Sequence, residues 1–321
     1  MYSKIQAIEY YLPKRVLTNS DLEEKFEKWD SSKIEKKVGI KNRHIADENE
    51  TSLELGLVAA KKILYYVNKE DIDFVLFCTQ SPEYFLPSGS CVIQERLGLR
   101  KNIGAFDINL GCSGYTYGLA IADSLIKNKI ANNVLFITAE TYSKYINPSD
   151  IGNLSVFGDG AAATFITGSE RNKILSFELG TDGAGYDKLI VRSGAMNKNS
   201  LDDEESKYLY MDGPDIFNFT MEVVPKLVND VLNKNFMVIN DIDMFIFHQA
   251  NKYILNYLRK KIGIPKEKFY VNLIETGNTV SSTLPIALKQ CLDDKIIKSG
   301  DKVMLIGFGV GLSWGGVVIE I

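Results

Sequence analysis

Short apolar runs alternate with longer amphipathic stretches along most of the chain. Four stretches have the apolar spacing of helices, at residues 52–67, 115–128, 214–234 and 282–292. Thr51, followed three residues later by Glu54, resembles a capping box before the first of them. The alternation predicts an α/β fold in which helices cover both faces of mostly parallel sheets. The apolar runs with the pattern of buried strands are 72–79, 103–110, 133–140, 161–168, 242–249, 268–275, 302–309 and 315–321.

The chain contains an internal repeat. DIDFVLFCTQ (71–80) and DIDMFIFHQA (241–250) both begin with Asp-Ile-Asp, continue through four apolar residues and end in a polar tip. In each copy a strand, a Gly-X turn and a helix follow, with Gly111-Cys112 in the first turn and Gly277-Asn278 in the second. We therefore predict two similar α/β halves, residues 1–172 and 173–321. The acidic cluster SLDDEESKY (200–208), in a less periodic stretch, is interpreted as a solvated loop.

Composition narrows the class of protein. The 321 residues are 45% hydrophobic and carry a net charge of −4 with acids and bases interspersed, which argues against a nucleic-acid surface. No apolar stretch approaches the roughly 20 residues that span a membrane, and the N-terminus lacks a signal-peptide pattern. We expect a cytoplasmic protein whose four cysteines are free thiols. Without a CxxC pair they do not predict a metal site.

Three chemically versatile residues follow predicted strands at equivalent places of the two halves. Cys112 follows strand 103–110, His248 lies at the end of strand 242–249, and Asn278 follows strand 268–275. Reactive groups of open α/β sheets collect at the carboxyl ends of strands. Two halves packed face to face would bring these three side chains into one pocket.

Cys112 lies between small residues at the start of a predicted helix. A helix N-terminus carries partial positive charge and free N–H groups, which lower the pKa of a thiol and favour the nucleophilic thiolate. Gly111 and Gly114 leave room for a substrate. The alternative interpretation is a small buried apolar residue, the usual state of a free cysteine. We assign the other three, Cys78, Cys91 and Cys291, to that alternative.

His248 and Asn278 each have a structural and a chemical interpretation. His248 could hydrogen-bond a reacting carbonyl or simply be a satisfied histidine at a strand end. Asn278 could donate to a developing oxyanion or serve only as a turn or N-cap residue. His44, within KNRH, is expected at the surface. The glycine-rich stretches 157–163 and 307–316 lack the strand-to-helix context of a dinucleotide site.

Together these motifs resemble the β-ketoacyl-acyl carrier protein synthase III family, which has the thiolase fold. The resemblance covers essentially the whole chain and implies two similar α/β halves in helix-sheet-helix-sheet-helix layers. The segments that carry it are GCSGYTYGL (111–119), FGDGAAA (157–163), FHQAN (247–251), ETGNT (275–279), SSTLPIAL (281–288), GFGVGLSWGG (307–316), LPSGS (86–90) and VGIKNRHIA (38–46).

The resemblance implies a Cys-His-Asn condensing enzyme that needs no metal or redox cofactor. Cys112 would take an acyl group from acyl-CoA or an acyl-carrier protein, with the backbone N–H groups of Cys112 and Val310 as oxyanion hole. His248 and Asn278 would bind the thioester carbonyl of malonyl-acyl carrier protein and stabilise the enolate left by loss of CO₂. Attack of that carbanion on the acyl-cysteine would give a 3-oxoacyl-acyl carrier protein, in fatty-acid initiation or a specialised pathway.

The resemblance also implies a homodimer. The loop near Leu86 would close the partner's acyl pocket, and Phe217 and Phe308 would lie beside the active-site tunnel. Lys37, Lys252, Lys260 and Lys261 would contact the donor or the carrier protein, with Arg259 in the same basic patch.

The donor surface departs from the family pattern. Lys33 holds the place of a tryptophan that stacks on adenine, and Trp29 is offset from it. Lys37 and Ile151 replace two expected arginines, and Lys252-Tyr253 replace a third. The departures at Lys33, Lys37 and Ile151 weaken the expected grip on the CoA nucleotide, and the one at Lys252-Tyr253 weakens a carrier-protein contact. The catalytic residues are unchanged.

Other functions remain open at this point. Cys112 could pass its acyl group to an alcohol or amine, with His248 as general base, although retention of both His248 and Asn278 favours condensation. A non-catalytic carrier-protein partner would not need Cys112. A biosynthetic thiolase would need a second active-site cysteine, which 307–316 lacks.

Overall fold

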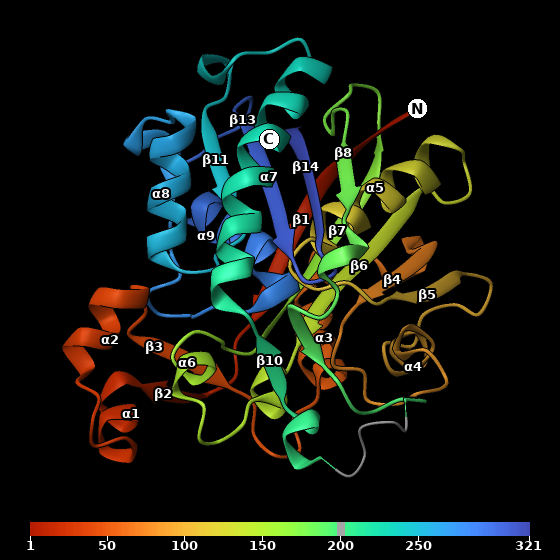
Figure 1. Cartoon of the computed structure of the whole chain (residues 1–321). Coiled ribbons are helices and arrows are strands. Elements are labelled where there is room, and N and C mark those ends of the chain that lie inside the picture. Colours follow the sequence, from red (N-terminus) through yellow and green to blue (C-terminus); the bar gives the residue numbers. More distant parts are fainter. Residues whose placement is uncertain (198–202) are drawn as a thin grey trace.

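The computed structural model describes residues 1–197 and 203–321, and its framework is two five-stranded sheets (Figure 1). The sheets have the strand orders β1-β7-β6-β4-β5 and β12-β11-β13-β14-β8. The first sheet contains β1 (Tyr2–Tyr11), β4 (Phe74–Cys78), β5 (Gly104–Ile108), β6 (Asn133–Glu140) and β7 (Gly160–Ser169). The second contains β8 (Glu178–Thr181), β11 (Met244–Phe247), β12 (Phe269–Tyr270), β13 (Lys302–Gly309) and β14 (Ser313–Glu320).

Both sheets are mixed and have the same pairing pattern. β4 is parallel to β5 and β6, whereas β7 is antiparallel to β6 and β1. In the second sheet β11 is parallel to β12 and β13, and β14 is antiparallel to β13 and β8. The expectation of mostly parallel sheets was therefore wrong for half of the pairs. The three residues between β13 and β14 show why, because so short a connection can only reverse the chain.

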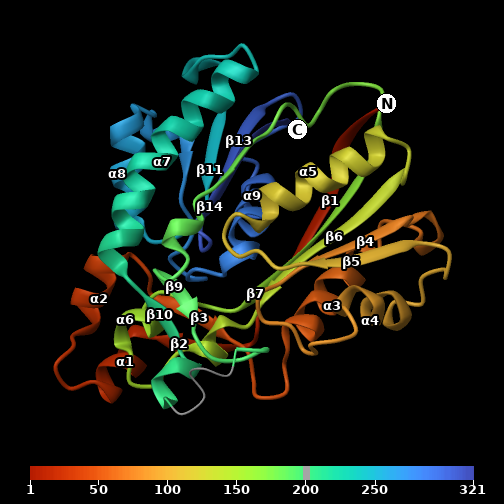
Figure 2. The ribbon, with the colours of Figure 1, turned by 45° about the vertical axis from the view of Figure 1, so that its right-hand side comes forward.

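Helices and sheets alternate in five layers, as expected (Figure 2). α5 (Gly114–Lys127) and α9 (Thr283–Asp293) lie between the sheets, in one core with the inward faces of β4, β6, β11 and β13. α3 (Ser52–Ile63) and α4 (Gly89–Arg96) cover the outer face of the first sheet. α7 (Gly213–Lys234) and α8 (Lys252–Ile262) cover the outer face of the second. Apolar residues on both faces of each central strand explain their nearly continuous hydrophobic sequences.

Smaller elements surround this framework. An N-terminal segment outside the two sheets contains β2 (Arg15–Thr18), α1 (Asn19–Lys25), α2 (Ser31–Val38) and β3 (Asn42–Ile45), and β2 pairs with β3. A separate two-stranded ribbon pairs β9 (Leu189–Val191) with β10 (Leu209–Met211). α6 (Ile151–Leu154) precedes β7. The 3₁₀ turns are η1 (Lys69–Asp71), η2 (Tyr142–Tyr145), η3 (Gly183–Gly185), η4 (Glu204–Lys207), η5 (Ile239–Asp241), η6 (Lys266–Lys268) and η7 (Val280–Ser282).

All eight predicted strands and four predicted helices are present, although run 268–275 contributes only the short β12. The prediction missed six strands, β1, β2, β3, β8, β9 and β10, and several helices, including α8. The capping box was half correct: the Thr51 hydroxyl accepts from the Glu54 amide at 3.2 Å, but the Glu54 carboxylate pairs with Arg96 instead of closing the box. Residues 200–202 of the acidic cluster lie outside the described chain, and η4 forms in the rest of the cluster.

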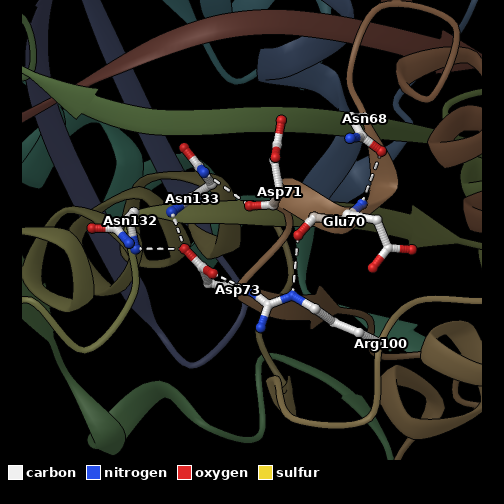
Figure 3. Close-up of polar contacts among 7 residues, drawn as sticks. All are labelled: Asn68, Glu70, Asp71, Asp73, Arg100, Asn132 and Asn133. Atoms are coloured by element: carbon white, nitrogen blue, oxygen red, sulfur yellow. Dashed lines mark hydrogen bonds and ion pairs between the residues drawn. The ribbon is translucent and has the colours of Figure 1, made fainter.

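The Asp-Ile-Asp repeat joins neighbouring strands at their amino ends. Figure 3 shows the Asp73 carboxylate accepting hydrogen bonds from the backbone of Asn132 and Asn133, at 2.8 and 3.0 Å, while it also pairs with Arg100. In the second half, Asp243 accepts from the Lys302 amide at the start of β13, at 2.8 Å. The repeated aspartate thus fixes the alignment of equivalent strands in both halves. The division at 172/173 stays a prediction.

Candidate active site

Cys112 lies in the tight turn between β5 and α5 and is only 5% exposed. The turn needs small residues because its neighbours are close. A Cβ on Gly111 would lie 2.5 Å from Gln80 Oε1 and 2.6 Å from Val310 Cγ1. A Cβ on Gly309 would lie 3.0 Å from Cys112 Sγ. The glycines therefore let the loop after β13 reach the sulfur.

The electrostatics of Cys112 differ from the expectation. Burial raises the pKa of the thiol to about 12, and the Glu140 carboxylate contributes in the same direction. Backbone N–H groups of Cys112 and Val310 lower this pKa, as a helix start and an oxyanion hole would, but they do not outweigh burial. The predicted net lowering was wrong because the sulfur is almost completely removed from water. Cys112 is a thiol at neutral pH, so its use as a nucleophile requires a proton acceptor.

His248 directly follows β11 and is 2% exposed. Its backbone N–H donates to the Ile306 carbonyl at 2.7 Å, which continues the pairing of β11 with β13. Its Nδ1 lies 2.7 Å from Thr283 Oγ1, and its ring meets the Phe308 ring edge-on at 5.5 Å. Burial lowers the pKa of His248 to about 3, so the imidazole is neutral at physiological pH.

Asn278 is held against the first half of the chain. Its N–H donates to the Val156 carbonyl at 2.9 Å, and its carbonyl accepts from the Gly158 N–H at 3.0 Å. The turn depends on Gly277, whose φ of +69° suits a residue without a side chain. With its backbone fixed, Asn278 points its amide Nδ2 toward His248 Nε2, at 3.5 Å.

The structure brings the predicted triad into one region. Cys112 shares an apolar cluster with Val280, two residues after Asn278, and with Val310. Phe308 touches His248, and the next residue, Gly309, adjoins Cys112. This arrangement places a thiol, a neutral imidazole, a carboxamide and two backbone donors around one small volume.

The other predicted site residues lie away from this cluster or on the surface. Leu86 is 82% exposed, and half-buried Phe217 makes ring contacts with Tyr253 and Tyr257 on α8. Lys37 lies over the Trp29 ring at 5.5 Å.

The lysines of the predicted basic patch have different surroundings. Lys252, Lys260 and Lys261 are all exposed, and Lys261 alone of the three donates to a backbone carbonyl, that of Met221, at 2.8 Å. Lys252 also lines a hollow between α2 and α8, together with Lys36 and Tyr253.

Sequence reasoning missed Glu140, a buried acid at the end of β6. Its carboxylate accepts from the Gln80 amide at 3.1 Å and from the hydroxyls of Ser81 and Ser281, each at 3.0 Å. Burial raises its pKa to about 8 although these donors oppose the change. Because Ser281 follows Asn278 in the second half, Glu140 connects the loop after β4 to the turn that carries Asn278. The sequence did contain one indication of this residue, an acidic residue at the end of the apolar run NVLFITAE.

The segment around His44 was also misjudged. His44 is half-buried, with Nδ1 2.6 Å from the Pro13 carbonyl. The neighbouring Arg43 is fully buried and donates to Ser155 O at 2.6 and 2.9 Å, to Lys41 O at 3.2 Å and to Asn19 Oδ1. Asp159 of the FGDG motif is buried too and accepts from the amides of Ala46 and Ser143. These contacts support the loops around the site.

Neither a candidate metal site nor a candidate membrane-spanning helix occurs in residues 1–197 and 203–321. No group of three or more His, Cys, Asp and Glu side chains could hold a metal ion. No helix in these ranges is long and apolar enough to cross a membrane.

Comparison with known proteins identifies similar chains along the full length. The models described as 3-Oxoacyl-[acyl-carrier-protein (ACP)] synthase III and its C-terminal part match residues 106–183 and 232–321. A Clostridium perfringens protein named Beta-ketoacyl-[acyl-carrier-protein] synthase III is 38% identical over 99% of both chains, and one from Fusobacterium nucleatum is 35% identical over 98% of both.

Solved structures agree with the sequence comparison. A crystal structure of a 3-oxoacyl-(acyl-carrier-protein) synthase III superposes with a TM-score of 0.97, 40% identity and complete coverage of both chains. The Aquifex aeolicus 3-oxoacyl-[acyl-carrier-protein] synthase III superposes with a TM-score of 0.90 and 36% identity, covering 99% of this chain and all of that one.

Proposed function

The chain belongs to the 3-oxoacyl-[acyl-carrier-protein] synthase III family, and from this premise we propose that it is a β-ketoacyl-acyl carrier protein synthase III. It condenses an acyl group from acyl-CoA with malonyl-acyl carrier protein and releases CO₂, the step that initiates fatty-acid synthesis. The convergence of Cys112, His248 and Asn278 in one buried region is the observation that carries the proposal.

In this proposal Cys112 forms the acyl-enzyme. Backbone N–H groups of Cys112 and Val310 already face the sulfur, where they can stabilise the oxyanion formed during attack on the thioester. Exclusion of water supports a long-lived acyl-enzyme because it protects the thioester from hydrolysis.

His248 and Asn278 act on the malonyl thioester. They flank the same space, and both have side-chain nitrogens at its edge. The Asn278 amide donates to the thioester carbonyl and stabilises the enolate that forms as CO₂ leaves. His248, neutral at physiological pH, is the second partner of that carbonyl. The enolate carbon then attacks the acyl-Cys112 carbonyl, and Cys112 leaves as a thiolate that is reprotonated.

The partners of the reaction are proposed on surface features. Exposed Lys36 and Lys252 line a hollow between α2 and α8 that can receive an acidic carrier protein, with exposed Lys37 and Lys260 on the same two helices. Tyr84, Phe85 and Leu86 form a run of exposed apolar residues, which supports a homodimer in which this loop covers the partner's acyl pocket. Half-buried Phe217 and buried Phe308 are proposed to line the path of the substrate.

The test is intact-protein mass spectrometry on the wild type and on Cys112→Ala, after incubation with acyl-CoAs and acyl-carrier proteins. We expect an acyl adduct on the wild type alone, discharged by malonyl-acyl carrier protein with release of CO₂. Cys78→Ala is the matched control, because it removes another buried thiol and should retain the adduct. Discharge by an alcohol or amine, but not by malonyl-acyl carrier protein, would instead select simple acyl transfer. No adduct with any donor would contradict the assignment of Cys112.

A further inference from the structure

Two buried serines, Ser113 beside the nucleophile and Ser313 at the start of β14, join the two halves of the chain. Their hydroxyl oxygens lie 2.7 Å apart, although the residues are 200 positions apart in the sequence. Ser113 is fully buried and Ser313 is 2% exposed, so water competes little for either hydroxyl. Ser113 is also the N-cap residue of α5, a position where a serine hydroxyl usually accepts a hydrogen bond from its own helix. Within the described part of the chain it makes no such bond, and its hydroxyl contacts Ser313 instead.

Val310 is tied to both serines. The Ser313 hydroxyl lies 2.8 Å from the Val310 carbonyl oxygen, which can only accept, so the Ser313 hydrogen is donated there. The Ser113 hydrogen is then donated to Ser313 Oγ. The N–H of the same Val310 faces the Cys112 sulfur. Because Cys112 and Ser113 are joined by a peptide bond, these contacts form a closed ring beside the oxyanion hole.

The loop that carries Val310 has little to fix it from its own sequence. β13 and β14 are joined by residues 310–312 alone, and Val310 is flanked by Gly309 and Gly311, with φ of +157° and +142°. Glycine adopts positive and negative φ about equally readily, so neither neighbour by itself sets the orientation of the Val310 peptide groups. The hydrogen bond from Ser313 to the Val310 carbonyl supplies that constraint.

We propose that Ser113 and Ser313 are positioning residues, a serine pair that fixes the Val310 N–H relative to the Cys112 N–H in the oxyanion hole. The inference rests on the proposed function and deepens it, because it says how the spacing of the two donors is maintained. The thioester carbonyl oxygen gains negative charge when the sulfur bonds to the carbonyl carbon, and again when the enolate carbon attacks the acyl-enzyme. Two N–H groups that are already oriented stabilise this charge without reorganisation.

Hydrogen exchange of the resting protein, measured by mass spectrometry of peptides, tests the serine pair without a substrate. In Ser113→Ala and in Ser313→Ala the amides of residues 309–313 should exchange about 3-fold to 10-fold faster than in the wild type, because the loop loses a buried hydrogen bond. Ser313→Thr keeps the hydroxyl and should exchange like the wild type. Ser3→Ala, which removes another fully buried serine hydroxyl, on β1, is the matched control. Unchanged exchange at 309–313 in both alanine variants would overturn the proposal.

Kinetics of acylation test the consequence for the oxyanion hole. At saturating donor each alanine variant should acylate on the order of 10-fold more slowly, with the half-saturating donor concentration within about 2-fold of wild type, because the charge develops only in the transition state. Ser313→Thr should acylate within about 3-fold of wild type. The double alanine variant should lose no more than the larger single loss, because both hydroxyls act through one contact. An unchanged saturating rate, or single losses that multiply in the double variant, would refute the positioning role.

The two proposals fail separately. Both alanine variants should fold, because β13 packs directly against the nucleophile turn: a Cβ on Gly307 would lie 2.8 Å from the Cys112 carbonyl oxygen. Thermal unfolding checks this, and if one variant does not fold, the other tests the same contact. Exchange is measured without a donor, so it decides the role of the serine pair even if nothing acylates Cys112. Failure of acylation in the wild type would contradict the proposed function, whereas unchanged exchange in an enzyme that acylates normally would contradict only the serine pair.

Discussion

The two halves of the molecule have the same strand order but place different chemistry at equivalent positions. Cys78 and His248 occupy the same place in the Asp-Ile-Asp repeat, at the ends of β4 and β11. The Cys78 thiol donates to the Leu110 carbonyl at 3.1 Å, and burial raises its pKa well above the usual value. His248 instead faces the site and takes part in its hydrogen bonds. The duplicated scaffold therefore fixes where a reactive group can be placed, and local packing decides whether it reacts.

The two Gly-X turns differ in a second way. After Cys112 the chain enters α5 at Gly114, whereas after Asn278 it first forms η7, in which Val280 has a φ of +54°. Asn278 also bridges to Phe157 of the first half. The Cys112 turn has a local backbone hydrogen bond, from the Gly114 N–H to the Gly111 carbonyl, whereas the backbone of Asn278 bonds to Val156 and Gly158 of the other half.

The sharpest test replaces two buried cysteines, Cys112 and Cys78, with alanine in separate variants. We expect Cys112→Ala to lower condensing activity on the order of 10³-fold or more, because no other described thiol is placed at the site. Cys78→Ala should keep activity within a few-fold and lose about 1–2 kcal/mol of stability through a small cavity. Initial rates and urea unfolding measure both effects. Comparable activity losses in the two variants would contradict the assignment of the reactive thiol to Cys112 and of a packing role to Cys78.

Arg43 tests the dependence of the Asn278 turn on the first half. Arg43→Met should lower the free energy of unfolding by roughly 3 kcal/mol, because the buried oxygens of Asn19, Ser155 and Lys41 lose their donors. The aliphatic part of the Arg43 side chain packs against Gly277. A Cβ added at Gly277 would lie only 3.1 Å from Arg43 Cγ. Chemical unfolding gives the change, with exposed Arg15→Met as the control. Equal free energies of unfolding for the two variants would contradict the proposed role of Arg43 in stabilising the Asn278 turn.

Glu140 joins the loop after β4 in the first half to Ser281 in the second half, and its burial makes stability depend on pH. Burial raises its pKa from 4.5 to about 8, so between these values the folded protein holds a proton that the unfolded chain releases. Stability from this group is therefore complete below about pH 4.5 and is lost as pH rises through about 8, by on the order of 1–3 kcal/mol. Urea unfolding between pH 5 and pH 8.5 should show a flatter profile for Glu140→Gln than for the wild type. If the free energy of unfolding of the wild type rose with pH across this interval relative to that of Glu140→Gln, the raised pKa of Glu140 would be contradicted.

The smallest expected difference concerns the repeated aspartates. Asp73→Asn should cost about 1–2 kcal/mol, because both carboxylate oxygens are used, one by Arg100 and one by two backbone amides. Asp243→Asn should cost less than about 1 kcal/mol, because one amide oxygen can still accept from Lys302. Thermal unfolding of both variants measures the contrast. A larger loss of stability in Asp243→Asn than in Asp73→Asn would contradict this ranking of the two repeated aspartates.

Much of the architecture could be predicted from the sequence. The long apolar runs and the repeat identified the central strands and the helices between the sheets, because buried strands and amphipathic helices impose strong periodic patterns. β1 was missed since YSKIQAIEYY mixes polar and apolar residues on an outer strand. The position of Glu140 could have been suspected from an acid at the end of a buried run, but its partners come from segments about 60 and 140 residues away.

The sequence by itself determined the duplicated α/β scaffold, the glycine-lined turn around Cys112 and the family to which the chain belongs. Only the tertiary structure decided that the Cys112 thiol stays protonated, because burial outweighs the helix N-terminus when the surrounding layers close over the sulfur. It also decided which groups His248 meets, since Asn278 and Thr283, 30 and 35 residues further along the chain, are brought to its two ring nitrogens. Spacing along a chain specifies which groups are available, whereas dielectric environment and hydrogen-bond direction depend on what folds around them.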